Sequence, residues 1–167
     1  MALATLLAIG LLVLMVTLVP EKTLPPGVSA DQVVVEKKTH RLLLVKNGRM
    51  LKSYAIALGR EPGPKERQGD GRTPEGKYRI DSRNAGSRYY RSLHISYPDQ
   101  EQRREARAKG LSPGGDIMIH GLPPKWAWVG RWHSLIDWTQ GCIAVTNREM
   151  DELWRAVPLH AEIEIKP

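Results

Sequence analysis

The stretch TQGCIAVTN, from Thr139 to Asn147, contains the only cysteine of this 167-residue chain. Cys142 follows Gly141 directly and begins the short apolar run CIAV, which is predicted to be a strand. A lone cysteine is most often a small buried hydrophobic residue. It becomes a useful nucleophile where a nearby imidazole or positive charge lowers the pKa of the thiol. The cysteine by itself leaves both interpretations open.

His120 is the candidate partner of this thiol. It lies 22 residues upstream and ends the run DIMIH, a second predicted strand. If the two strands are neighbours, the imidazole and the sulfur meet at one edge of the sheet. The backbone N–H groups beside Cys142 would then face the carbonyl under attack, as an oxyanion hole requires.

Four tryptophans lie between these two residues, in the run LPPKWAWVGRWHSLIDWTQG of residues 122–141. The run has little periodicity, which predicts a long loop, and loops longer than about 12–15 residues in a compact domain are usually functional or disordered. Four indole rings argue against disorder. We interpret the segment as a lid over a peptide-binding groove, with packing in the core as the alternative, chiefly for Trp138.

Most of the remaining chain reads as β-strands. Asn47-Gly48 predicts a two-residue hairpin turn, and residues 59–76, with five glycines and three prolines, are predicted to be a loop. The predicted strands, besides the two above, cover residues 32–36, 41–46, 51–58, 77–81, 92–97 and 161–166.

Two helices complete the predicted elements. Asp99 caps a charged helix that runs through Lys109, and the capping box of Thr146 and Glu149 opens an amphipathic helix that ends before Pro158. Strands outnumber helices, so the expected fold class is mainly β, a β-rich α+β domain.

The N-terminal segment predicts a membrane anchor. Ala2 to Val19 contains no charged residue, and as a helix it would nearly span a hydrocarbon core of about 30 Å. We expect residues 1–20 to be this anchor; the alternative is a cleavable signal segment with a small-residue site at Val28-Ser29-Ala30. Residues 21–31 are predicted to be a Pro-rich linker and residues 32–167 a single domain.

The charge of the chain fits an anionic partner. The formal net charge is +7, which suits nucleic acid, phospholipid head groups or a carboxylate-rich cell-wall polymer, or serves solubility alone. Arg83, Arg88 and Arg91, with Tyr89 and Tyr90 between them, resemble a nucleic-acid patch. An exported domain meets little nucleic acid, so we expect no nucleic-acid partner and assign these arginines to peptide carboxylates.

Metal and disulfide chemistry have little support in the sequence. One cysteine excludes an intramolecular disulfide. His94, His133 and His160 could join His120 and Cys142 as ligands, but none of the five has metal-site spacing. We expect neither a metal nor another cofactor.

IMIHG followed by a long loop and TQGCIAVTN resembles the L,D-transpeptidase catalytic domain, also called YkuD. GRTPEGKYRID resembles the Thr-Pro-x-Gly turn that precedes a central strand in this family, and GDGRTPEG with GDIMIHG is more similar to the YafK-like branch. The resemblance covers most of residues 32–166. It implies a β-sandwich or barrel and a cysteine enzyme that acts on peptidoglycan stem peptides, with Cys142 as nucleophile, His120 as proton donor and acceptor, and Gly141 in the oxyanion site.

Two positions depart from the family pattern. Ala144 stands where many members have Arg or Asn, and Gln140 stands where many have His. Both lie beside the nucleophile, so the departures leave the acylation step intact but leave open whether an amine or water resolves the thioester.

We expect substrate contacts from residues around this pair, namely Gly121, Trp126, Trp132, His133, Thr139 and Arg72. For two of them an alternative remains: His133 could instead face solvent, and Arg72 could instead hold its loop. The expected enzyme is a transpeptidase of cell-wall biogenesis, anchored in the inner membrane with its domain in the periplasm. The alternatives are a hydrolase of the same fold that cleaves peptidoglycan cross-links or protein–peptidoglycan links, and a non-catalytic, basic, wall-binding, membrane-anchored protein. The oligomeric state is left open.

Overall fold

A computed structural model describes residues 23–167, so the expected anchor of residues 1–20 lies outside the described residues. Its first three strands form an antiparallel meander: β1 (Gln32–Glu36), β2 (Arg41–Lys46) and β3 (Arg49–Ala55). The predicted turn at Asn47-Gly48 is confirmed. Both residues have positive φ, 50° and 73°, as the twist of a two-residue hairpin demands.

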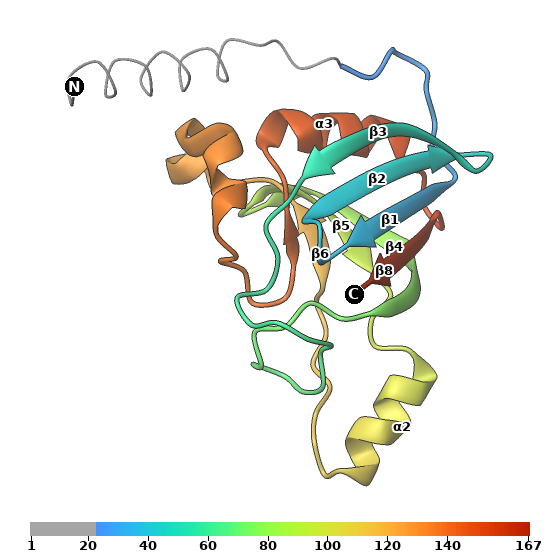
Figure 1. The fold of residues 1–167 in the computed structure, drawn as a ribbon, viewed down its shortest axis with the longest axis vertical. Coiled ribbons are helices and arrows are strands. Elements are labelled where there is room, and N and C mark those ends of the chain that lie inside the picture. Colours follow the sequence, from blue (N-terminus) through green and yellow to red (C-terminus); the bar gives the residue numbers. More distant parts are fainter. Residues whose placement is uncertain (1–22) are drawn as a thin grey trace, which may run out of the picture.

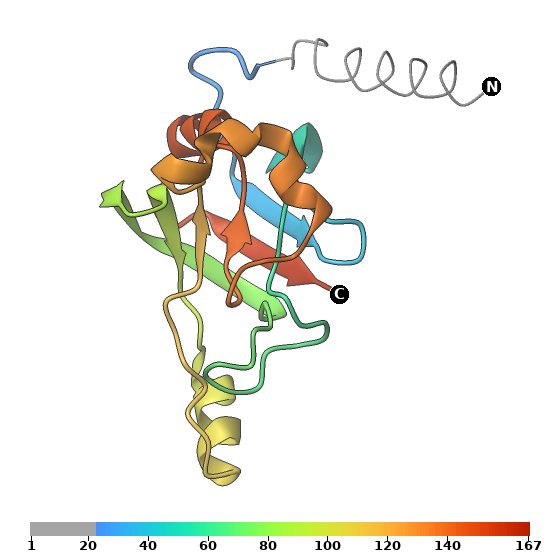
Figure 2. The ribbon, with the colours of Figure 1, turned by 90° about the vertical axis from the view of Figure 1, so that its left-hand side faces the viewer.

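The sheet has eight strands in the order β3-β2-β1-β8-β4-β5-β6-β7. The remaining strands are β4 (Gly76–Ser87), β5 (Tyr90–Ile95), β6 (Met118–His120), β7 (Ile143–Ala144) and β8 (Glu162–Lys166). The pairs β1–β8 and β6–β7 are parallel, and the others are antiparallel. Figures 1 and 2 show how the sheet curves around the core.

β4 is longer than the predicted strand of residues 77–81, and it joins two halves of the sheet. Its first residues pair with β8, and its later residues pair with β5 after a register shift. The two edge strands of the sheet are β3 and β7. Ala57, just after β3, exchanges both backbone hydrogen bonds with Ala144 of β7. The segment that follows β3 therefore pairs with β7, so the two edges of the sheet meet and the edge strand that carries the site is covered.

Among the described residues 23–167, three helical segments accompany the sheet. α2 (Gln100–Ala108) has the capping box of Asp99 and Gln102 and lies apart at one end of the molecule (Figures 1 and 2). α3 (Asn147–Ala156) begins at the predicted capping box of Thr146 and Glu149 and packs against β5. The segment predicted to be a long loop is largely a 3-10 helix, η1 (Pro124–Leu135), with a kink at Gly130.

The burial of side chains in the structure confirms the alternation of apolar and polar residues along the predicted strands. Fully buried side chains come from all eight strands and the inner face of α3, and include Val33, Leu42, Leu44, Tyr54, Ile80, Leu93, Ile119, Ile143, Leu153 and Ile163. The mainly β fold with a few helices is therefore as predicted. Within residues 23–167 no helix is long and apolar enough to cross a membrane.

Candidate active site

His120 ends β6, and Cys142 immediately precedes β7, the parallel neighbour of β6. β6 and β7 pair with His120 opposite Ala144, and Cys142 lies two residues before Ala144. Alternate residues of a strand share a face, so both side chains project from the same face of the sheet, with their Cα atoms about 8 Å apart by strand geometry. Both line one groove of about 640 Å³.

The imidazole of His120 is fixed by three neighbours. Its Nδ1 lies 2.7 Å from the carbonyl oxygen of Gly121. A carbonyl only accepts hydrogen bonds, so Nδ1 carries the proton and Nε2 is left with its lone pair. The ring lies against Tyr89, with centroids 4.5 Å apart, and meets the edge of Trp138 at 5.8 Å. Burial lowers the pKa of His120, which keeps the imidazole neutral.

The thiol of Cys142 is half-buried and protonated. Burial raises the pKa of Cys142, and the carboxylate of Asp116 raises it further; a backbone hydrogen bond from Met118 and the charges of Lys65 and Arg88 oppose this shift. The sulfur lies 3.5 Å from the carbonyl oxygen of Asp116, as an S–H donor would. The groove therefore holds a neutral thiol and a neutral imidazole at rest, and not the thiolate that a lowered pKa would give.

A tight turn presents the thiol. The hydroxyl of Thr139 donates to the carbonyl of Cys142 at 2.7 Å and accepts the N–H of Gly141 at 3.1 Å. Gly141 has φ +126°, and a Cβ placed there would lie 2.5 Å from the carbonyl oxygen of Arg72. Glycine before the cysteine is thus required by backbone conformation and by the approach of the 59–75 loop. The Gly141 N–H is already bonded, which leaves the N–H of Cys142 as the candidate donor to an oxyanion.

The 59–75 loop is held in place by buried lysines. Lys37 donates to the carbonyls of Gly63 and Thr73 and pairs with Glu75 at 2.7 Å. Lys65 pairs with Asp70, also at 2.7 Å, and both side chains are buried. These bonds fix the carbonyl of residue 72 against the turn at Gly141. Arg72 itself points along the loop, toward the carbonyl of Pro64, so of its two expected roles the structure favours holding the loop.

The predicted substrate residues separate into two groups. Trp126 and Thr139 line the groove, although the hydroxyl of Thr139 is engaged in the turn. Gly121 is buried, and a Cβ there would lie 2.5 Å from the side-chain oxygen of Asn147.

Trp132 and His133 lie elsewhere. Trp132 is 48% exposed on η1 and does not line the groove. His133 is buried and lines a second cavity that shares no residue with the active-site groove, so the alternative that it faces solvent is wrong. Burial lowers the pKa of His133 to about 4.

Several groove residues were missed as contacts or given another role. They are Tyr89, Asp116 and Arg60, whereas Trp138 and Arg88, which also line the groove, were expected there as part of the lid and as a partner of peptide carboxylates. Tyr89 and Arg88 belong to the basic and aromatic run noted in the sequence, and packing in the core was the alternative for Trp138. Asp116, which has φ 56°, and Arg60 carried no signal, because their position depends on the paths of two loops.

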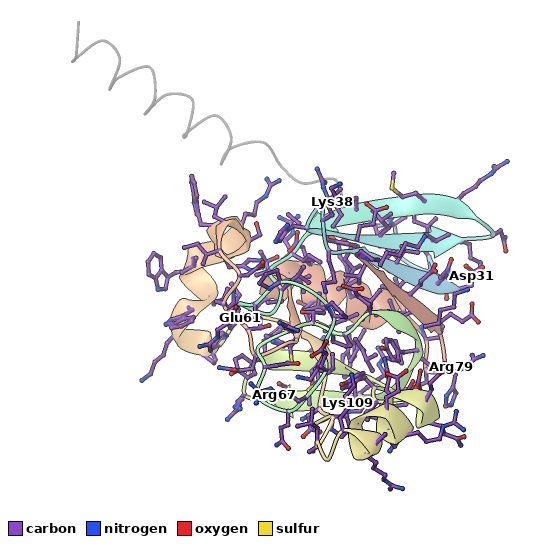
Figure 3. All side chains as sticks on the ribbon, turned by 60° about the horizontal axis from the view of Figure 1, so that its bottom comes forward. Asp31, Lys38, Glu61, Arg67, Arg79 and Lys109 are labelled. Carbon is purple, nitrogen blue, oxygen red and sulfur yellow. The ribbon has the colours of Figure 1, made fainter. Side chains whose placement is uncertain are left out.

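Arg60 also lines a polar groove over the 59–75 loop, which adjoins the first one through Arg60 and Gln140. In Figure 3 the labels of Glu61 and Arg67 mark this loop. Across residues 23–167 no cluster of three metal-ligating side chains is found.

Comparisons with known proteins match this arrangement. Residues 30–165 match the L,D-transpeptidase catalytic domain, YkuD. YafK of Escherichia coli, provisionally named an L,D-transpeptidase, is 34% identical over 133 residues, which are 75% of this chain and 46% of that protein. The chain therefore spans about half the length of the curated relatives it matches.

Two solved structures are similar in fold. Pgp2, a helical cell shape determining protein of Campylobacter jejuni, is 23% identical with a TM-score of 0.59, covering 89% of this chain and 53% of that one. An L,D-transpeptidase of Xylanimonas cellulosilytica is 19% identical with a TM-score of 0.54, covering 87% and 64%.

Proposed function

Because this chain belongs to the L,D-transpeptidase catalytic domain family, YkuD, we propose that it is a cysteine acyltransferase that acts on peptidoglycan stem peptides. The observation that carries the proposal is the pairing of β6 with β7. It brings the lone thiol and an imidazole with a free Nε2 lone pair to one face of the sheet and into one groove.

Acylation begins from the neutral pair. The sulfur of Cys142 attacks the carbonyl that joins the third residue of the stem to the following D-residue, while Nε2 of His120 takes the thiol proton. The tetrahedral oxyanion accepts a hydrogen bond from the N–H of Cys142. The C–N bond then breaks, the imidazolium returns its proton to the amine of the leaving D-alanine, and a thioester remains.

The thioester is resolved by a second nucleophile. An amine of another stem, or of an attached protein, attacks the carbonyl and gives its proton to His120, which returns it to the departing thiolate. Tyr89, Trp126 and Trp138 give the groove an apolar wall, and Arg60 and Arg88 supply positive charge for the carboxylates of the stem. The neutral resting imidazole suits this scheme, because a base must be unprotonated before it acts.

Hydrolysis is the alternative for the second step. Ala144, buried beneath the site, gives no polar group to hold an acceptor, and Gln140 is exposed at the junction of the two grooves. Water reaching the thioester would release a shortened stem instead of a cross-link.

The domain arrangement and location form part of the same proposal. Residues 32–167 would be the catalytic domain, residues 21–31 the linker, and residues 1–20 an anchor that keeps the domain in the periplasm, where stem peptides are found. A cleaved signal segment would leave the same domain in the same compartment.

Product analysis tests the proposal. The full chain is incubated with purified tetrapeptide stems, with and without a D-amino acid as acceptor, and separately with cross-linked stems, and the products are separated and weighed by mass spectrometry. Cross-linked or exchanged stems would support acyl transfer, whereas shortened stems or cleaved cross-links alone would support the hydrolase. A chain that changes no stem, while Cys142→Ser behaves identically, would indicate the non-catalytic wall-binding alternative.

A further inference from the structure

η1 and the residues after it expose an unusual number of large apolar side chains. Within residues 23–167, five of the eight exposed large hydrophobic residues lie between positions 126 and 136. They are Trp126 (53% exposed), Trp128 (84%), Trp132 (48%), Leu135 (70%) and Ile136 (73%). Single exposed apolar residues are normal in soluble domains, whereas several on one short segment indicate an interaction site. We call these five residues the flap surface.

The flap surface stands away from the body of the domain. In Figure 3 the side chains of η1, in orange, project outward from the edge of the molecule. Trp126 is the member shared with the active-site groove, where it meets the edge of Trp138 at 5.9 Å. Trp128, Leu135 and Ile136 line none of the grooves around the thiol, so the proposed reaction does not account for their exposure.

The chemistry of the flap surface fits a lipid interface. Tryptophan combines a large apolar ring with one N–H donor and concentrates at the boundary between hydrocarbon and head groups. Lys125 and Arg131, both exposed, are interleaved with the tryptophans and suit anionic head groups. Leu135 and Ile136 offer no ring for stacking on a sugar and no polar group, which favours hydrocarbon over a glycan strand. The net charge of +7 opposes pairing of two copies and favours an anionic surface.

The position of Thr23, Leu24 and Pro25, in the linker, provides an independent argument for a membrane surface as the partner. A cavity of about 670 Å³ is lined by Thr23, Leu24 and Pro25 on one side and by Arg131, His133 and Ser134 of η1 on the other. The start of the described chain and η1 therefore face the same cavity. Figures 1 and 2 show both at the same end of the molecule, opposite α2.

The sequence just upstream is the uncharged run from Ala2 to Val19. Thr23 follows Val19 by four positions, and four residues span at most about 14 Å. Insertion of that run in a bilayer would therefore hold the η1 end of the domain next to the membrane surface.

We propose that the flap surface docks on the surface of an anionic phospholipid bilayer, beside the point where the chain leaves it. The indole rings enter the interfacial region, and Lys125 and Arg131 face the head-group phosphates. Docking places the rim of the active-site groove at the membrane, because Trp126 belongs to both surfaces. The catalytic groove is then oriented toward substrate that lies close to the bilayer.

Collision accessibility of a spin label tests this docking on the full chain. In a Cys142→Ser background, Trp128→Cys or Leu135→Cys carries a nitroxide, and each protein is reconstituted in vesicles of phosphatidylethanolamine and phosphatidylglycerol. Oxygen concentrates in lipid, whereas a nickel chelate stays in water. Leu111→Cys is the matched control, since Leu111 is an exposed apolar residue just after α2, at the opposite end. Circular dichroism before and after labelling verifies that each variant is folded.

We expect the ratio of oxygen to chelate collisions to be several-fold higher at positions 128 and 135 than at position 111. Equal ratios at all three positions would overturn the proposal, because the flap surface would then lie in water. Dipolar broadening between labels at position 128 that persists in detergent would also overturn it, since a second copy would be the partner.

Discussion

Gly141 explains the position of the reactive thiol at the scale of a single residue. Its φ of +126° turns the chain so that Cys142 enters β7 with its sulfur toward the groove, and the carbonyl of Arg72 occupies the space a side chain would need. Thr139 then secures the turn with its hydroxyl. The residue before the nucleophile therefore acts through the backbone.

Gly141→Ala should abolish turnover and lower the free energy of unfolding by at least about 3 kcal/mol, because strain and a clash with Arg72 add together. The control is Gly63→Ala. Gly63 has φ +88° but open space around it, so alanine there should cost only about 1–2 kcal/mol and leave activity in place. Urea unfolding and stem-peptide turnover measure the two effects. Equal losses in both variants would contradict the role given to the contact with Arg72.

The sequence predicts the residues of the site better than their bonds. Cys142 and His120 stand out by residue type, and their meeting requires only that two short strands be neighbours. The bond from Gly141 to Thr139 and the approach of Arg72 depend on a loop path that no local pattern encodes. The same holds for Asp116 and Arg60, which reach the groove from segments without periodicity.

At the scale of elements, η1 differs most from its prediction. The absence of a helical period of 3.6 residues predicts a loop, but a 3-10 helix repeats every three residues and kinks here at Gly130. The kink separates the tryptophans, so that Trp126 faces the groove and Trp132 does not. β4 is also longer than predicted, because its polar second half is a strand only through pairing with β5.

Trp126→Ala should lower kcat/KM by roughly three- to tenfold, since an exposed ring of the groove wall contributes about 0.5–1.5 kcal/mol of aromatic contact. Its melting temperature should change little, because the side chain is 53% exposed. Trp132→Ala is the matched control, and we expect near-parental kinetics from it. A large loss of stability with unchanged kinetics in Trp126→Ala would mean that this ring is part of the core.

His133 gives η1 a pH dependence. Its pKa falls from 6.5 to about 4 on folding, so the folded chain binds fewer protons than the unfolded chain between these values. The neutral, buried imidazole is therefore favoured above pH 6.5, and its contribution to stability is lost as the pH falls toward 4. His133→Phe should remove roughly 2 kcal/mol of the stability change between pH 7 and pH 5. Urea unfolding of both proteins at the two values provides the test, and parallel losses would contradict the assignment.

At the scale of the whole molecule, the pairing of Ala57 with Ala144 brings the edges of the sheet together and covers β7. The mainly β fold follows from the alternation of its strands, whereas strand order depends on long-range pairing that alternation does not specify. The parallel contact of β6 with β7 is such a pairing, and it decides the site.

Location is also a property of the whole molecule. A reporter that is active only in the periplasm, fused after Pro167, should be active in cells. The physical reason is that the stem peptides proposed as substrate lie outside the cytoplasm. The same fusion with a reporter that works only in the cytoplasm is the control, and activity of that reporter would contradict the proposed location.

The central claim is that His120 acts as the base for the thiol of Cys142, and the rate of alkylation against pH tests it most directly. The full chain and His120→Ala are treated with iodoacetamide, with His160→Asn as a control for loss of an imidazole outside the groove. Burial lowers the pKa of His120 and raises the pKa of Cys142. The parent profile should therefore rise as the imidazole deprotonates, level off, and rise again as the thiol ionises above its ordinary value of about 8.5.

His120→Ala should lose the first rise and the plateau, keeping only the rise at high pH, while His160→Asn should follow the parent. Curves for the parent and His120→Ala that coincide would contradict the account, because the imidazole would then have no part in the reactivity of the thiol.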